Sequence, residues 1–169
     1  MDQNIKIKRL GYDDWQDLKA IRLEALLNNP QVFLRRYDDE IKQDDSYWQR
    51  SFVGEAAVQK AIFGLYANGV IIGMGGIHPE ADIARAARLG GAYISAPYRG
   101  RGLAHGLIKA RLDWARASAL HDAAYVSHRK GNAPSKAAIE KAGFALAEQK
   151  MILWPDGAEA AEYIYKLKL

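Results

Sequence analysis

A short segment rich in glycine and arginine has residue types and spacing that favour a defined chemistry. Residues 89–95 fit a strand and a helical pattern begins at Gly102, so the segment joins a strand to a helix. The first amide groups of a helix lack partners within it and carry the positive end of its dipole, so they bind phosphate well. Gly100 and Gly102 permit close approach, while Arg99 and Arg101 add positive charge. The segment therefore predicts a site for a phosphorylated ligand, although an ordinary strand-to-helix turn fits the same residues.

Two common phosphate-binding loops are excluded by the spacing of these residues. A P-loop requires Gly-Lys-Ser/Thr at the start of the helix, and the segment has no such triplet. The dinucleotide fingerprint Gly-x-Gly-x-x-Gly requires a third glycine where His105 stands, and it occurs at the first strand-to-helix turn of a domain. A phosphorylated ligand here must therefore be held by a different kind of loop.

The composition indicates one globular domain. The chain has 169 residues, of which 49% are hydrophobic and 26% charged, and this suits a single core rather than a disordered chain. It has no cysteine, which excludes disulfide bonds, cysteine metal sites and a cysteine nucleophile. Residues 1–6 lack the apolar stretch of a signal peptide, and no segment has the length of a membrane span. We therefore expect a soluble, cytoplasmic protein without a membrane partner.

The net charge of +4 fits an ordinary solvated surface or attraction to an anionic ligand. Nucleic acid also fits the sign, but the sequence has no zinc-finger spacing, RNA-binding aromatic motif or basic zipper. We therefore expect no nucleic-acid partner.

The order of the predicted elements indicates a mixed α/β domain. Helices are expected from Trp15 to the stop at Asn28-Asn29-Pro30, and over residues 38–52, 102–119 and 132–142. Strands are expected at residues 5–10, 61–66, 70–74, 89–95, 123–127, 144–153 and 162–169. Asn68-Gly69 predicts a hairpin, and Gly90-Gly91 predicts a bulge or a close backbone approach within its strand.

A family resemblance joins these features. Arg99-x-x-Gly102-x-Ala104 resembles the Arg/Gln-x-x-Gly-x-Gly/Ala signature of the GNAT superfamily of acyl-CoA-dependent N-acetyltransferases. Residues 132–144, which run from Asn132 to Gly143-Phe144, resemble the family's Asn-x-x-Ala/Ser…Glu-Lys-x-Gly-Phe helix. Residues 22–33 and 154–157 are similar to the first helix and the last hairpin of one subgroup, so the resemblance covers nearly the whole chain.

The resemblance implies one N-acetyltransferase domain over residues 1–169. Its α/β fold (α+β type) has a mixed, mainly antiparallel sheet of about six to seven strands, splayed at the centre, with about four helices. The cosubstrate is acetyl-CoA, whose pantetheine arm pairs with backbone groups and whose pyrophosphate lies on the glycine-rich turn; no metal is expected. The implied cofactor-binding residues are Ile94, Ser95, Ala96, Arg99, Gly100, Arg101, Gly102, Leu103, Ala104 and Asn132.

The implied reaction is direct attack of a primary amine on the thioester, aided by proximity and by an amide group at the oxyanion. The amine must first lose a proton, and many relatives use a carboxylate for this step and a tyrosine as acid to the thiolate. The positions that match these two groups hold Arg88 and Ile139. The missing groups also fit a non-catalytic acyl-CoA-binding regulatory module.

His128 is our candidate for the missing base, because histidine titrates near neutral pH and this one ends a strand near the cleft. A structural hydrogen bond fits it as well. Ser127 is a candidate to hold a relay water, and Tyr93 and Tyr98 are candidate proton donors, although ordinary packing explains all three. The remaining histidines are too scattered to form a metal site.

The acceptor is an unidentified small-molecule or peptide amine. The acidic residues in the run 38–45 either attract a cationic amine or form a solvated helix face. Arg22 alternatively faces a carboxylate of the acceptor. We expect a monomer or a homodimer.

Overall fold

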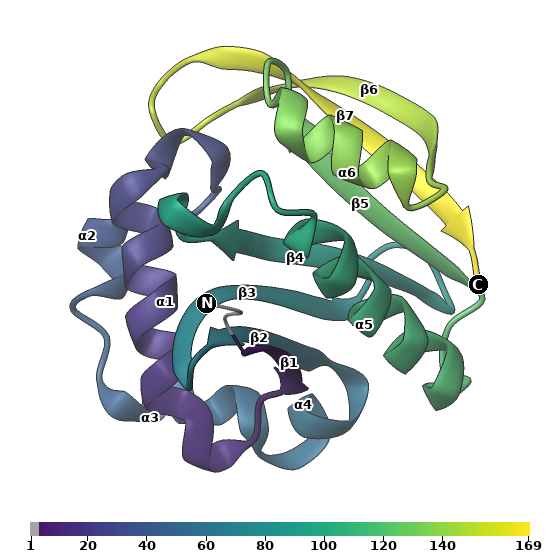
Figure 1. The fold of residues 1–169 in the computed structure, drawn as a ribbon. Coiled ribbons are helices and arrows are strands. Elements are labelled where there is room, and N and C mark those ends of the chain that lie inside the picture. The colour runs from purple at the N-terminus through teal and green to yellow at the C-terminus, as the bar shows by residue number, and fades with distance from the viewer. Residues whose placement is uncertain (1–3) are drawn as a thin grey trace.

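The computed structural model describes residues 4–169, and its centre is a seven-stranded sheet in the order β1-β2-β3-β4-β5-β7-β6 (Figure 1). The strands are β1 Ile5–Arg9, β2 Ala61–Ala67, β3 Val70–Pro79, β4 Ala86–Ile94, β5 Ala123–Arg129, β6 Ala145–Leu153 and β7 Glu159–Lys168. Neighbouring strands pair antiparallel except β4 and β5, which are parallel. This confirms the predicted α/β class and its mixed, mainly antiparallel sheet.

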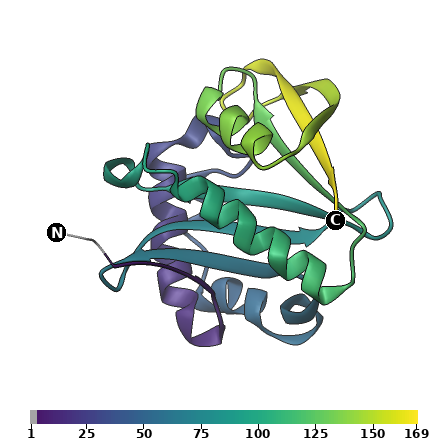
Figure 2. The same cartoon turned by 45° about the vertical axis from the view of Figure 1, so that its right-hand side comes forward.

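Helices cover both faces of the sheet (Figures 1 and 2). The α-helices are α1 Trp15–Asn28, α2 Tyr37–Glu40, α3 Asp45–Gln49, α4 Gly54–Gln59, α5 Leu103–Ser118 and α6 Ala133–Lys141. Both long helices bury apolar residues at helical spacing, such as Leu18 and Ile21 in α1 and Ile108 and Leu112 in α5. The α5 residues share a core with α6, and the α1 residues share another core with Trp48 of α3. We call the two sides of the sheet the α5 face and the α1 face.

Several local predictions are confirmed. Asn68 and Gly69 join β2 to β3 with φ of 50° and 83°, the left-handed geometry of a tight hairpin.

The predicted bulge is in β4. Met74 pairs with Tyr93 and Gly76 pairs with Gly90, so the single residue Gly75 lies opposite both Gly91 and Ala92. Gly91 has a φ of +62°, which favours glycine. The first helix ends before Pro30, as expected.

The predicted helix over residues 38–52 and the expected number of about four helices are wrong. The described part of the chain has six α-helices, because this segment folds as short α2 and α3 and because α4 was not expected. The chain turns after Glu40, and the side chain of Asp44 accepts the amide of Tyr47 to start α3 afresh. Trp48 is buried but Ile41 is exposed, so the two do not share a buried helix face.

The sheet splays between its two parallel strands. The β4–β5 ladder ends at the pair Leu89 and Val126, but β4 continues to Ile94 and β5 continues to Arg129 along β7. Beyond that pair the two strands are not bonded to each other. The splayed centre that we expected is therefore present, and it places open backbone beside the start of α5.

None of the helices in residues 4–169 is both long and apolar enough to cross a membrane. The prediction that residues 1–6 lack a signal peptide concerns a segment of which Met1, Asp2 and Gln3 lie outside the described residues.

Candidate functional site

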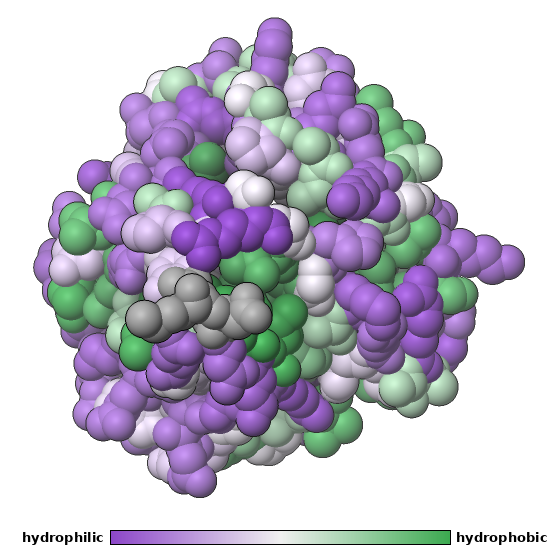
Figure 3. Space-filling view, in the orientation of Figure 1, coloured by the Kyte–Doolittle hydropathy of each residue, from purple (hydrophilic) through white to green (hydrophobic). Residues whose placement is uncertain are grey.

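A large cavity of about 1600 Å³ occupies the splay between β4 and β5. From the α5 face it is lined by the start of α5, by Ile108 and Arg111, and by Asn132 and Ile139. From the α1 face it is lined by Arg22, Phe33, Glu40, Trp48, Arg88, Ser127 and Glu162. Figure 3 shows one face of the molecule, where apolar residues gather toward the centre of the view and hydrophilic residues surround them. The volume exceeds that of an ordinary small-molecule pocket, so a large ligand and a second reactant can both be held.

The glycine-rich turn borders one end of this cavity. Gly100 and Gly102 have φ of +74° and +75°, and a Cβ at either position would meet no atom within 4 Å. α5 starts at Leu103, so the amides of Leu103 and Ala104 lack intrahelical partners. Because the glycines leave the space in front of these amides open, the turn has the geometry that an anionic group requires.

The two arginines of the turn hold the loop together. Arg99 donates from Nε to the Ile94 carbonyl at 2.7 Å and from Nη2 to Asn29 Oδ1 at 2.8 Å, and it lies over the Tyr93 ring. Arg101 donates to the Pro97 carbonyl at 3.0 Å. Both arginines therefore position the turn as well as supplying positive charge.

Most of the predicted cofactor-binding residues line the cavity. These are Ile94, Arg99, Gly100, Gly102, Leu103, Ala104 and Asn132, whereas Ser95, Ala96 and Arg101 are not among its lining residues. The Ser95 amide donates to the Ile72 carbonyl of β3 at 2.8 Å, so it faces away from β5. Because backbone groups alternate along a strand, Ile94 directs its own toward the gap, on the side where its carbonyl accepts Arg99 Nε. Ala92 also lines the cavity and was not predicted.

Asn132 is the N-cap of α6. Its Oδ1 accepts the amide of Ser135 at 3.3 Å, and Pro134 lies in the first turn of the helix. Since Oδ1 caps the helix, the Nδ2 amide is the part of this side chain that is suited to donate to a ligand.

On the α1 face, at the point where the splay begins, four charged groups surround a serine. Arg88 pairs with Glu80 and donates to Ser127 Oγ at 3.5 Å. Ser127 Oγ donates to Glu162 Oε1 at 2.6 Å, and Lys150 lies 3.7 Å from Glu162 Oε2. Glu162 is only 8% exposed, and a buried carboxylate that lines a cavity can bind a cation or accept a proton.

His128 lies on the α5 face and lines the same cavity. Its Nδ1 is 2.9 Å from the Arg129 carbonyl, so Nδ1 carries the proton, and Nε2 accepts from the Tyr165 hydroxyl at 3.2 Å. Burial raises the pKa of Tyr165, which keeps its hydroxyl protonated as a donor. His128 also stacks on Tyr163. Both ring nitrogens thus have partners, and its role as a base stays a prediction.

The acidic segment and Arg22 meet at one end of the cavity, on the α1 face. Arg22 forms two 3.0 Å hydrogen bonds with Glu40, which is 5% exposed. A Cβ on Gly91 would lie 3.9 Å from Arg22 Nη1, so this guanidinium faces the bulge of β4. The four aspartates in the run 38–45 are exposed, and Glu40 alone of this run's acids lines the cavity.

Arg111 is a buried cation on α5. It is 2% exposed, it donates to the carbonyls of Leu107 at 3.0 Å and Gly76 at 3.3 Å, and burial lowers its pKa to about 10. No carboxylate among residues 4–169 forms an ion pair with it. A Cβ on Gly75 would lie 3.0 Å from the guanidinium carbon, so glycine at this position leaves room for the side chain.

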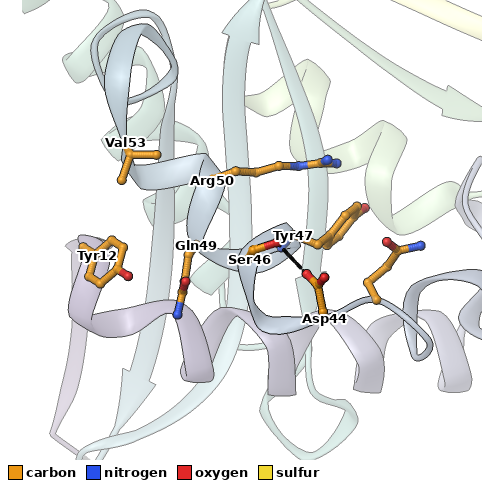
Figure 4. A pocket seen from close by; sticks show the side chains of 8 residues that line it. Tyr12, Asp44, Ser46, Tyr47, Gln49, Arg50 and Val53 are labelled. Carbon is orange, nitrogen blue, oxygen red and sulfur yellow. Dashed lines mark hydrogen bonds between the residues drawn. The ribbon is translucent and has the colours of Figure 1, made fainter.

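A second, smaller hollow of about 600 Å³ lies beside α3 (Figure 4). The guanidinium of Arg50 lies 4.1 Å from the centre of the Tyr47 ring, and these two residues line both the hollow and the large cavity. The hollow therefore adjoins the α1 side of the large cavity.

Of the acids that line the cavity, sequence reasoning named Glu40 but missed Glu80 and Glu162. Glu24 accepts the hydroxyls of Tyr93 and Ser95, and thereby fixes the end of β4. A sequence signal was present only for Glu40, within the acidic run. Within residues 4–169, no three side chains of the metal-binding types are arranged to hold a metal ion.

Solved structures with the same architecture are acetyltransferases at low sequence identity. A putative acetyltransferase from Acinetobacter baylyi is 16% identical, with a TM-score of 0.83 over 100% of this chain and 95% of the other. A putative acetyltransferase from Salmonella typhimurium, solved with its cofactor acetyl-CoA, is 16% identical, with a TM-score of 0.79 over 98% and 94%. A ribosomal-protein-S5-alanine acetyltransferase from Vibrio fischeri is 12% identical, with a TM-score of 0.81 over 99% and 94%.

The search of curated proteins finds no match to this sequence. In contrast, the sequence model of the Acetyltransferase (GNAT) family matches residues 15–144. This span begins with the first residue of α1 and ends directly after the glycine that follows α6. This span includes the bulged β4, the glycine-rich turn, the splay and the Asn132 cap. Family match and fold agree, so the chain belongs to the acetyltransferase (GNAT) family.

Proposed function

We propose that the protein transfers an acetyl group from acetyl-CoA to a primary amine of a small molecule or peptide by direct attack. The observation that carries the proposal is the gap between β4 and β5, which opens beside the unpaired amides at the start of α5. A strand edge in the gap suits the amide-containing pantetheine arm, and the helix start suits a pyrophosphate. A neighbour of this fold was solved with acetyl-CoA, which supports the same ligand here.

In this proposal the cofactor enters from the α5 face and the amine from the α1 face. The pyrophosphate lies on the turn from Gly100 to Ala104, and Asn132 donates to the pantetheine arm. The thioester then lies where β4 and β5 part, near Leu89 and Val126. Acceptor contacts come from the α1 face, where Arg22, Glu40 and Trp48 line the cavity. Holding both reactants in one cavity supplies catalysis by proximity.

Calorimetry with acetyl-CoA and with CoA tests the cofactor half. Gly102→Asp places a carboxylate before the pyrophosphate, and we expect it to weaken binding at least about tenfold, which is about 1.4 kcal/mol. Arg99→Ala removes charge and loosens the turn, so it is expected to weaken binding as well. Gly54→Asp is the matched control, because Gly54 also begins a helix with positive φ in open space but lies outside the cavity. Absence of binding by folded wild-type protein overturns the proposal.

A second function, a non-catalytic acyl-CoA-binding regulatory module, is favoured by Arg88 and Ile139. Both residues line the cavity at positions where the resemblance implies a carboxylate and a tyrosine. An assay of thiol release across amines, amino acids and peptides separates the two functions. Steady turnover with any natural amine excludes the module, whereas tight acetyl-CoA binding without turnover supports it.

A further inference from the structure

A hydrogen-bonded serine and glutamate lie where the two parallel strands separate. Ser127 follows Val126, the last β5 residue paired with β4, and Ser127 Oγ donates to Glu162 Oε1 at 2.6 Å. Ser127 points to the α1 face, because its neighbour Val126 belongs to the core on the α5 face. Both side chains line the cavity. The pair therefore borders the apex of the splay on the side from which the amine arrives.

The charged groups around Glu162 leave its carboxylate open to the cavity. Arg88 on β4 is neutralised by Glu80, and it touches the serine only through a long 3.5 Å contact. Lys150 on β6 lies 3.7 Å from the other carboxylate oxygen and is half exposed. Arg129, which pairs with Glu162 across the β5–β7 ladder, forms its own ion pair with Asp156. The charged neighbours of Glu162 thus do not close its carboxylate off from the cavity.

We infer that Ser127 and Glu162 receive the proton that the acceptor amine loses before attack, an inference that rests on the proposed function. The ammonium gives one proton to Ser127 Oγ as Ser127 gives its own proton to Glu162. The amine lone pair then forms the new C–N bond at the thioester carbonyl. The C–S bond breaks with its electron pair on sulfur, and the CoA thiolate takes the second amine proton. Glu162 releases its proton to solvent, so atoms and charges balance.

In this proposal Ser127 and Glu162 act as the base, a role for which the sequence offers His128. The lone pair on His128 Nε2 already accepts the Tyr165 hydroxyl, and its Nδ1 proton is directed to a backbone carbonyl. A proton from the amine would have to displace Tyr165 in a buried site. Ser127, in contrast, keeps one lone pair for a new donor, since a hydroxyl accepts two hydrogen bonds and Arg88 takes only one.

Glu162→Gln tests the inference, because glutamine keeps the size of the side chain and accepts the Ser127 hydroxyl but cannot take a proton. With acetyl-CoA and the amine that the wild type acetylates fastest, we expect kcat/KM at pH 7 to fall about 100-fold. The loss should shrink as pH rises, because the amine deprotonates in solution. Ser127→Ala should give a similar profile, and the double variant should lose little more than either single variant.

Two measurements separate this inference from other outcomes. The affinity for acetyl-CoA and the melting temperature of Glu162→Gln should match those of the wild type. Glu159→Gln, on the same strand but outside the cavity, should leave the pH profile unchanged. A wild-type profile in Glu162→Gln, with the loss found in His128→Gln instead, overturns this inference but leaves the acetyltransferase proposal intact. Absence of turnover with every amine overturns both.

Discussion

Leu89 and Tyr93 are four residues apart on β4, yet their side chains pack on opposite faces of the sheet. Leu89 belongs to the core under α5, and Tyr93 belongs to the core under α1. In a regular strand two residues at this spacing share a face. The extra residue in the bulge at Gly91 and Ala92 reverses the alternation. The bulge therefore sets both which backbone groups point into the gap and which side chains lie on the α1 face.

Gly91→Ala is expected to lower the free energy of unfolding by about 1 to 2 kcal/mol, because Gly91 has a φ of +62°. A Cβ there meets no close atom, so the cost is conformational strain rather than a clash. The variant should also bind acetyl-CoA more weakly, since relaxing the bulge turns backbone groups away from the gap. Denaturant unfolding and calorimetry measure the two effects.

Gly90→Ala is the control for this change. Its Cβ would lie 3.7 Å from His78 Nε2, an ordinary contact, and its φ is not in the left-handed region. We expect it to change stability by less than about 1 kcal/mol, in either direction. Equal destabilisation by both substitutions would contradict the role given to the bulge.

Asn132→Asp separates the capping role of Asn132 from its proposed contact with acetyl-CoA. Aspartate accepts the Ser135 amide as asparagine does, so the melting temperature should be unchanged. It loses the amide donor and adds a negative charge near an anionic cofactor, so acetyl-CoA should bind about tenfold more weakly or worse. Thermal unfolding and calorimetry of the same sample test this.

Asn132→Ala supplies the comparison, because it removes the cap and should cost about 1 kcal/mol of stability. If Asn132→Asp binds acetyl-CoA as tightly as the wild type, Asn132 is only a helix cap.

The sequence predicts those features that depend on neighbours along the chain. The Asn68-Gly69 hairpin and the helices predicted over residues 102–119 and 132–142 are local, so their residue types are sufficient. The single helix over residues 38–52 was predicted wrongly, because the chain turns after Glu40 and Asp44 caps a new helix, α3, which contains Trp48. The partners of Ser127 could not be predicted, since Arg88 and Glu162 lie 39 and 35 residues away in sequence. A strand pattern assigns a residue to a face but not to a hydrogen bond.

Arg111→Met is expected to leave stability unchanged or to raise the free energy of unfolding by about 1 to 3 kcal/mol. The guanidinium pays a desolvation cost that no carboxylate offsets among the described residues, and methionine fills a similar volume. Because Arg111 lines the cavity beside Gly76, we also expect weaker acetyl-CoA binding. Lys109→Met, an exposed change on the same helix, should shift stability by no more than about 0.5 kcal/mol. A marked loss of stability in Arg111→Met would show that the hydrogen bonds of Arg111 stabilise the fold by more than the desolvation of its guanidinium costs.

His121 should make the fold less stable below neutral pH. Within the described residues, neither of its buried ring nitrogens has a hydrogen-bond partner. Burial lowers its pKa, and Arg85 lowers it further, while Asp122 opposes them. Because the pKa in the folded state is below the unfolded value of about 6.5, the unfolded chain binds more protons as the pH falls. The contribution of His121 to the free energy of unfolding is therefore fully present above pH 6.5. It is lost as the pH falls from there toward the pKa of His121 in the folded state.

His121→Leu removes this group and tests the linkage. Denaturant unfolding between pH 7.5 and pH 5 should show a smaller loss of stability in the variant than in the wild type. At pH 7.5 the variant should be as stable as the wild type or more stable by about 1 kcal/mol, because two unpartnered nitrogens are removed from the interior. His105→Leu, at an exposed position on α5, should keep the wild-type pH dependence. If the wild type and His121→Leu lose the same stability between these pH values, the pH dependence arises from other groups, because a neutral leucine cannot bind the proton that His121 takes up on unfolding.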